Sequence, residues 1–209
     1  MVSRCGLVLG AVVAALSASI GPSFAAPQPN PVPTRWEFEF EPGPLRLTVV
    51  ETEDGPQPFL YLTYRVANYT DRDRIFAPSF EMMTDEGTLR RSGRDVPRSV
   101  TRAIIDRLEN PLLEDQLSIV DTLRRGRENA KFGVVVWPVE DFQIDEATVF
   151  AAGFSGESTS YFTTDPETGQ RTRHLLRKTR VLRYDLPGQI EPQRRDTPFD
   201  VIERAWEMR

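Results

Sequence analysis

The sequence predicts a mainly β protein, an Ig-like antiparallel β-sandwich with an inserted helical segment and a short C-terminal helix. Three observations lead to this fold class. Apolar and polar residues alternate in several short runs, turn-forming residues separate the runs, and strands do not alternate with helices as in a parallel sheet. The clearest stretch is 60–91, where an alternating strand ends in a polar turn at 68–71 and a second strand closes at 84–87.

Residues 1–25 are predicted to form a signal peptide. Arg4 supplies a positive start, residues 6–20 form an apolar stretch, and Ser23-Phe24-Ala25 fits the small-x-small cleavage pattern. The apolar run is shorter than the roughly 20 residues that a membrane span needs. Cys5 precedes this run instead of lying at its cleavage end, which argues against a lipid anchor. We therefore expect an exported protein, periplasmic or secreted, cleaved after Ala25.

After the signal peptide we expect a Pro-rich linker at 26–34 and a single domain at 35–209. The only cysteine leaves with the signal peptide, so the domain would fold on its own core without a disulfide. The chain carries a formal net charge of −5, and removal of the signal peptide takes away one cation and no acid. Export and this acidic balance argue against nucleic acid as a partner.

The first strands are predicted at the start of the domain. Aromatic residues alternate with acids there: Trp36, Phe38 and Phe40 with Glu37, Glu39 and Glu41. The 42–44 Pro-Gly-Pro stretch is expected to turn the chain into a return strand at 45–49, with the acids on a solvated face. Further strands are expected at 59–68, 148–154 and 179–184. The nearly continuous apolar run 131–137 is typical of a strand buried on both faces.

A helix is expected at about 96–108. Val100, Ile104 and Leu108 recur every four residues, Asp95 is the expected N-cap, and a proline at 111 stops the run. We expect the three apolar side chains to face the sheets. The segment 112–123 is compatible with either a second helix or a strand.

The C-terminal segment is predicted to be a short helix that begins near Pro198. Phe199, Ile202 and Trp206 would share one face of it. Such a stripe either docks on the domain or binds a partner. Docking is favoured, because an exposed Trp and Phe together would form a patch that soluble proteins usually avoid.

The motifs of catalysis are incomplete. Ser155 sits in a near miss to a nucleophile elbow, because Glu157 replaces the final glycine of that motif. The single histidine, His174, has no recognisable partner in the sequence, which disfavours a hydrolase triad and a zinc site. Calcium at 71–73 or 84–86 matches no EF-hand loop, and solvated turns are the favoured interpretation. We expect no cofactor and no metal.

One basic run stands out in this acidic chain. Its members are Arg171, Arg173, Arg177, Lys178, Arg180 and Arg183. The run could bind an anionic surface polymer, or its charges could protect an exposed edge strand from pairing with other chains. Edge protection is favoured, because the basic residues occupy both alternating faces instead of one stripe.

The chain resembles an uncharacterised family of exported planctomycete proteins of unknown function. The resemblance rests on stretches 36–50, 66–70, 78–87, 133–137 and 153–157 and on the terminal 206–209. It implies one exported domain and no known activity.

Two function classes follow. The first is a non-catalytic extracytoplasmic binding or structural module whose partner is an envelope protein or an anionic surface polymer. The alternative is an enzyme of unrecognised type with a carboxylate-based site. The candidate interaction residues are Phe199, Ile202, Trp206, Arg173, Arg177 and Arg180.

Overall fold

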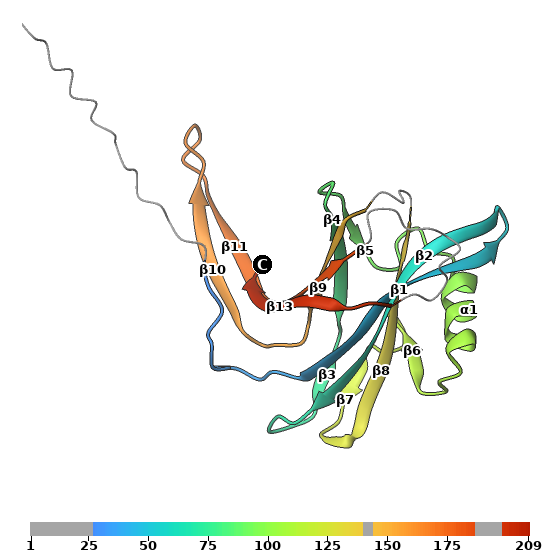
Figure 1. Ribbon diagram of the computed structural model, residues 1–209. Helices are drawn as coiled ribbons and strands as arrows, with labels where there is room; N and C mark the ends of the chain where they lie inside the picture. The colour runs from blue at the N-terminus through green and yellow to red at the C-terminus, as the bar shows by residue number, and fades with distance from the viewer. Residues whose placement is uncertain (1–26, 140–143, 187–197) are drawn as a thin grey trace, which may run out of the picture.

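The computed structural model describes residues 27–139, 144–186 and 198–209, so the predicted signal peptide lies outside the described residues. The described chain is mainly β, with antiparallel sheets and one short helix (Figure 1). The first half holds β1 (Glu39–Thr52), β2 (Gly55–Asn68), β3 (Arg74–Phe76), β4 (Ser79–Thr84), β5 (Leu89–Arg91) and α1 (Arg98–Leu108). The second half holds β6 (Leu113–Asp115), β7 (Asp121–Leu123), β8 (Gly126–Pro138), β9 (Glu146–Ala152), β10 (Ser158–Thr164), β11 (Arg171–Asp185), β12 (Pro198–Phe199) and β13 (Val201–Met208).

These strands form two large sheets and one small one. The first sheet has the order β12-β1-β2-β8-β6, and its pairs are antiparallel except for β6 with β8. The second has the order β10-β11-β9-β4-β5, and β13 also pairs with β11. Strands β3 and β7 form a separate pair. β11 is the longest strand and makes contact with three others, a point on which the candidate site depends.

The main core lies between the two large sheets. Phe40 and Tyr64 of the first sheet meet Phe80 of the second and Phe154, which follows β9. The ring centroids of Phe40 and Phe154 are 4.2 Å apart, and those of Tyr64 and Phe80 are 4.9 Å apart. Each fully buried side chain of this size contributes about 1.5 to 3 kcal/mol. This aromatic cluster holds the sheets together.

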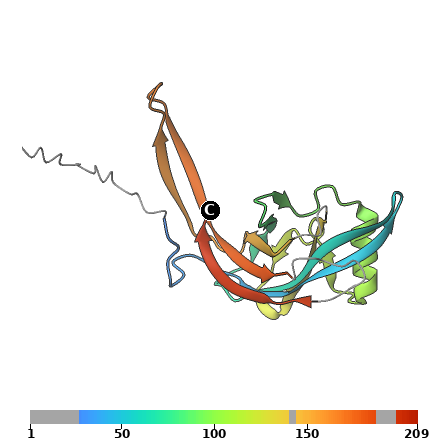
Figure 2. The same cartoon turned by 45° about the horizontal axis from the view of Figure 1, so that its top comes forward.

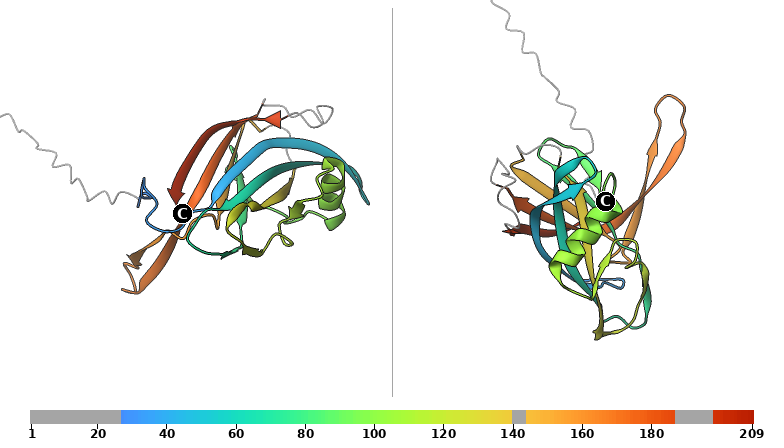
Figure 3. Two further views of the ribbon diagram at one scale, coloured as in Figure 1. Left: turned by 90° about the horizontal axis from the view of Figure 1, so that it is seen from below. Right: turned by 90° about the vertical axis from the view of Figure 1, so that its right-hand side faces the viewer.

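Helix α1 covers the outer face of the first sheet (Figure 3). Val100 and Ile104 are buried against residues of β1, β2 and β8, as their spacing predicts. β8 is consequently buried on both faces: Val135 and Trp137 belong to the main core, and Val134 packs toward the helix. The prediction for 131–137 is confirmed.

The ends of α1 agree only in part with the sequence. The helix ends at Leu108, where Glu109 adopts a left-handed conformation before the predicted proline stop. The predicted N-cap is wrong. Pro97 occupies the cap position without a side-chain cap bond, and Asp95 has a φ of 59° two residues earlier.

The predicted turn at 42–44 is wrong. β1 runs through these residues as a β-bulge and pairs with β2 on both sides of it, so the chain reverses only between Thr52 and Gly55. A Cβ at Gly43 would lie 2.8 Å from Oγ1 of Thr63, so the bulge needs a residue without a side chain. Long-range pairing with β2 overrides the local turn preference of the Pro-Gly-Pro stretch.

The segment 112–123 contains the short strands β6 and β7, which decides the open choice against a second helix. The predicted C-terminal helix is wrong. Val201–Met208 forms strand β13 along the edge of β11, while Phe199 pairs with Leu45 of the first sheet. As a strand, this segment pairs its backbone groups with the edge of β11. That pairing is more stable than the short isolated helix that the spacing of its apolar residues would permit.

Candidate functional site

The most prominent feature of the surface is a two-stranded hairpin that projects from the body. It consists of β10 and the first part of β11, and we call residues 158–177 the arm (Figure 2). The partners run in register from Ser158 with Arg177 to Thr164 with Arg171. None of its residues belongs to either core cluster of the described chain. An isolated two-stranded hairpin is only marginally stable, so a long projecting one calls for an explanation.

One face of the arm is basic and apolar. Directly opposed residues of an antiparallel pair share a face, and alternate residues of one strand do as well. This places on one face Arg171, Arg173, Leu175 and Arg177 from β11 together with Phe162 from β10. Over the whole of β11 the basic residues do occupy both faces, but within the arm they share one, because Lys178 and Arg180 lie beyond it.

The basic-apolar face is exposed. Phe162 and Leu175 retain 50% and 53% of their exposure, and the guanidinium of Arg171 lies 4.1 Å from the centre of the Phe162 ring. Within the described residues no ion pair holds Arg173 or Arg177. This face combines free guanidinium groups with accessible apolar surface, as recognition sites for anionic partners do.

The opposite face stiffens the arm. The Tyr161 and His174 rings are stacked with centroids 4.9 Å apart, and Oγ1 of Thr163 lies 2.8 Å from Nε2 of the histidine. At the tip, Asp165 accepts hydrogen bonds from the backbone N–H groups of Thr168 and Glu167, which lowers the pKa of this carboxyl group. These local contacts align the two strands without help from the core.

The root of the arm is held by a buried ion cluster. Lys178 is 2% exposed, and its Nζ lies 3.1 Å from Glu37 and 3.4 Å from Glu157. Nζ also donates to the backbone carbonyl of Asn30 at 3.3 Å. Three oxygen partners compensate the cost of burying this ammonium group, as a stable buried charge requires.

The same cluster ties residues of the predicted linker to the arm. The backbone N–H and the side-chain amide of Asn30 both donate to Oε1 of Glu157 at 2.9 Å. The pKa of the Glu157 carboxyl group lies below its usual range. The hydrogen bond from the backbone N–H of Asn30 is the largest cause, and Lys178 lowers it further. Both carboxylates already have partners, so the cluster acts as an anchor.

The C-terminal candidates do not form one stripe. Phe199 is buried in the first sheet, Ile202 is 61% exposed, and Trp206 packs against the main core from the second sheet. Trp206 also lies under Lys178 and Arg180, whose charges are each 5.1 Å from its ring. Arg180 is thus half-buried at the root, apart from Arg173 and Arg177 on the arm, and burial lowers the pKa of its guanidinium group.

The residues that the sequence suggested for catalysis or calcium binding lie apart from one another or are already paired. The Ser155 hydroxyl donates to the backbone carbonyl of Trp36 at 3.4 Å, while His174 lies on the arm. Asp71 pairs with Arg74, and Asp73 accepts the backbone N–H of Arg125. Within the described residues, no three His, Cys, Asp or Glu side chains are grouped to hold a metal.

The acids that were predicted to share one solvated face do not all lie on it. Glu39 and Glu41 are exposed and pair with Arg65 at 3.0 and 3.2 Å, in line with a solvated face. Glu37 departs from this prediction, because its carboxylate turns to Lys178.

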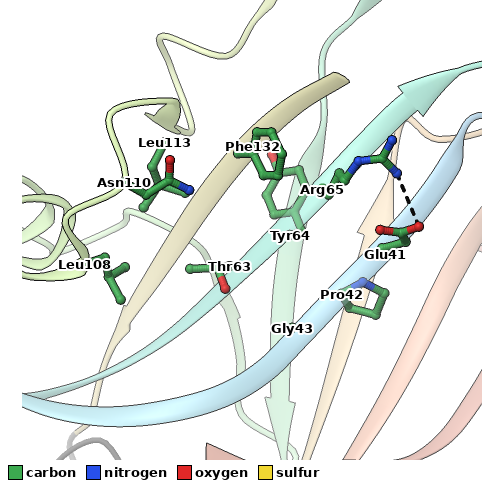
Figure 4. A pocket seen from close by; sticks show the side chains of 10 residues that line it. All are labelled: Glu41, Pro42, Gly43, Thr63, Tyr64, Arg65, Leu108, Asn110, Leu113 and Phe132. Atoms are coloured by element: carbon green, nitrogen blue, oxygen red, sulfur yellow. Dashed lines mark ion pairs between the residues drawn. The ribbon is translucent and has the colours of Figure 1, made fainter. Parts of the chain in front are cut away.

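A groove of about 440 Å³ lies between the end of α1 and the outer face of the first sheet (Figure 4). Leu108, Leu113 and Phe132 give it an apolar floor and wall, and Arg65 stands at its rim with Glu41. Arg65 supplies the only guanidinium group among the described residues that line the groove, and it is paired with Glu41, while the side-chain oxygen of Asn110 accepts the backbone N–H of Leu112. Apart from the buried hydroxyl of Tyr64, which has no hydrogen-bond partner in the described part of the chain, the groove offers less unpaired chemistry than the arm.

Comparison with protein-family models, with curated proteins and with solved structures finds no match to this chain. In the described part of the chain, no helix is long and apolar enough to cross a membrane. The sequence did hold a signal for the arm. Basic residues at alternate positions 171, 173 and 177 follow a run rich in Thr, Tyr and Phe, with a Gly-containing turn between them.

Proposed function

We propose that this protein is a non-catalytic extracytoplasmic binding module that binds a carboxylate-bearing partner through the arm. The observation that carries the proposal is the exposed basic-apolar face of the arm. Arg173 and Arg177 are free of ion pairs among the described residues, and guanidinium groups bind carboxylates through bidentate hydrogen bonds. Phe162 and Leu175 add apolar contact between these charges.

The rest of the fold serves as a rigid support in this proposal. The two sheets share one core, which supports an Ig-like sandwich as the framework. The buried anchor at Lys178 fixes the angle at which the arm leaves the body. Export through a signal peptide cleaved near Ala25, and kinship with the exported planctomycete proteins that the sequence resembles, are parts of the same proposal.

Binding to two carboxylate polymers tests the proposal. Fluorescence anisotropy with labelled polyglutamate and labelled polygalacturonate separates an acidic polypeptide from an acidic polysaccharide. The double variant Arg171→Glu/Arg173→Glu should weaken binding by about a hundredfold, because two charge-assisted contacts become repulsive. The wild-type affinity should also fall as salt is added.

The matched control is Arg102→Glu/Arg124→Glu. Both residues are exposed and lie outside the arm, and the change in net charge is the same. This control should retain binding to within about threefold, since net charge alone acts weakly at a distance in salt. Equal loss in both variants, or no loss in the arm variant, would overturn the proposal.

A further inference from the structure

The two edges of β11 are occupied differently along its length. β13 pairs with β11 from Tyr184 to Lys178, and the backbone groups of Arg177 and Arg209 exchange two hydrogen bonds. Beyond this point, residues 171–176 have β10 as their strand neighbour on one edge, and no described strand pairs with the other edge. The edge that β13 covers near the body is therefore open along the arm.

The hydrogen-bond pattern shows which backbone groups face this open edge. The N–H of Lys178 donates toward β10, to the carbonyl of Glu157, whereas the N–H and C=O of Arg177 point to the opposite side. Successive residues of a strand alternate in this direction. The backbone groups of Leu175, Arg173 and Arg171 therefore point outward along the open edge.

The open edge and the basic-apolar face belong to the same residues. We propose that the partner binds as an additional β-strand on β11, in line with β13, and that it is an extended acidic segment of a protein. Backbone pairing with an exposed sheet edge is a recurrent mode of peptide recognition, in which alternate side chains provide specificity. This inference rests on the proposed function and specifies its partner.

The register of the arm specifies the partner's pattern. A strand antiparallel to β11, as β13 is, meets Leu175 first, then Arg173, then Arg171. On the basic-apolar face it would therefore present an apolar residue followed by two acids, with one residue between each. Charge complementarity selects acids, because three arginines and no acid from the two strands lie on this face. A polysaccharide lacks the regularly spaced main-chain amide groups that pairing along the open edge requires.

Three synthetic peptides test the mode of binding. The first has the sequence Thr-Val-Thr-Glu-Thr-Glu-Thr, blocked at both ends. The second carries N-methyl groups on the backbone nitrogens of its valine and both glutamates, which keeps the charge and removes the backbone donors that face β11. The third exchanges glutamate for lysine. We expect the first to bind, and the other two to bind at least about tenfold more weakly. Equal binding of the first two overturns strand addition.

A variant of the protein tests the same point from the other side. Leu175→Pro removes an outward N–H and leaves the pairing with β10 intact, as edge strands tolerate. It should weaken binding of the first peptide by about tenfold, whereas Leu175→Ala, which keeps the N–H, should weaken it less. A thermal melt checks that both variants fold.

The outcomes separate the two proposals. If Leu175→Pro binds as well as Leu175→Ala while Arg171→Glu/Arg173→Glu does not bind, strand addition is overturned and the carboxylate-binding function stands. If Arg171→Glu/Arg173→Glu binds the peptide and polyglutamate as the wild type does, the proposed function fails first.

Discussion

Strand β11 passes through two environments, and the same residue type behaves differently in each. Along 171–177 it has one strand neighbour, and its arginines are exposed. Strand β13 pairs with it from Lys178 and β9 pairs with it from Arg180, and along this part its cations are partly buried or paired: Lys178 with two glutamates, Arg183 with Glu146 and Glu203. The basic run that looked uniform in sequence is divided at a single residue boundary.

The difference shows that the burial of its side chain decides the role of a charge on a sheet. Where packing covers the face of the strand, as at Lys178, water is excluded and a cation must find partners or be removed. On the arm the basic side chains are exposed, so a cation costs little and stays available to a ligand. The inner part of β11 is therefore structural, and the outer part is the candidate binding surface.

Lys178→Met should produce the largest effect. It leaves Glu37 and Glu157 facing a buried space without their cation, which should lower the free energy of unfolding by about 3 to 5 kcal/mol. Urea denaturation measures the change. Arg173→Met on the exposed part of the same strand is the control and should stay within about 0.5 kcal/mol. Equal urea denaturation midpoints for the two variants would contradict the difference between the inner and outer parts of β11.

Trp206→Ala tests the aromatic side of the root. The indole packs against the main core and under two cations, so its removal should cost about 2 to 4 kcal/mol. Phe162→Ala on the arm should change the denaturation midpoint by less than about 1 kcal/mol, because that ring is half exposed. Unchanged stability of Trp206→Ala together with lost binding of polyglutamate would instead make β13 a binding element.

Glu157→Gln should have a pH-dependent effect. The folded-state pKa of Glu157 lies below its ordinary value, so its charged form stabilises the fold above that value, about 4.3. Near pH 7 the variant should lose about 1.5 to 3 kcal/mol, the range for a charge-assisted hydrogen bond. The difference from wild type should shrink as the pH falls through the lowered folded-state pKa. A difference that is constant from neutral to acidic pH would contradict the charged anchor.

Shortening the arm should have the smallest effect on stability. An Asn-Gly turn that joins Ser160 directly to Leu175 removes the tip and keeps three cross-strand pairs. No arm residue lies in a core cluster of the described chain, so unfolding of the body should change by less than about 1 kcal/mol. Binding of polyglutamate should be abolished. A large loss of stability would show that the arm is part of the folding unit.

The sequence anticipated the elements whose local pattern and tertiary environment agree. The apolar run at 131–137 became a strand covered on both faces, and the four-residue spacing of Val100 and Ile104 became the buried side of α1. Side-chain polarity and backbone geometry suffice for such assignments, since a period of 2 or 3.6 residues places apolar groups on one side. The same reasoning left 112–123 open, because its short apolar runs satisfy both periods.

The candidate site depended on information that is not local. The sequence showed six basic residues in one run, but only the pairing of β11 with β10, β9 and β13 decided which are buried. It also placed Phe199, Ile202 and Trp206 on one helical face, whereas strand pairing distributes them over two sheets and the solvent. Composition, the β class and the helical face of α1 were determined by the chain alone. The bulge at Gly43, the strand at the C-terminus and the exposed face of the arm were decided by the tertiary structure, because each requires an edge or a neighbour supplied by a distant segment.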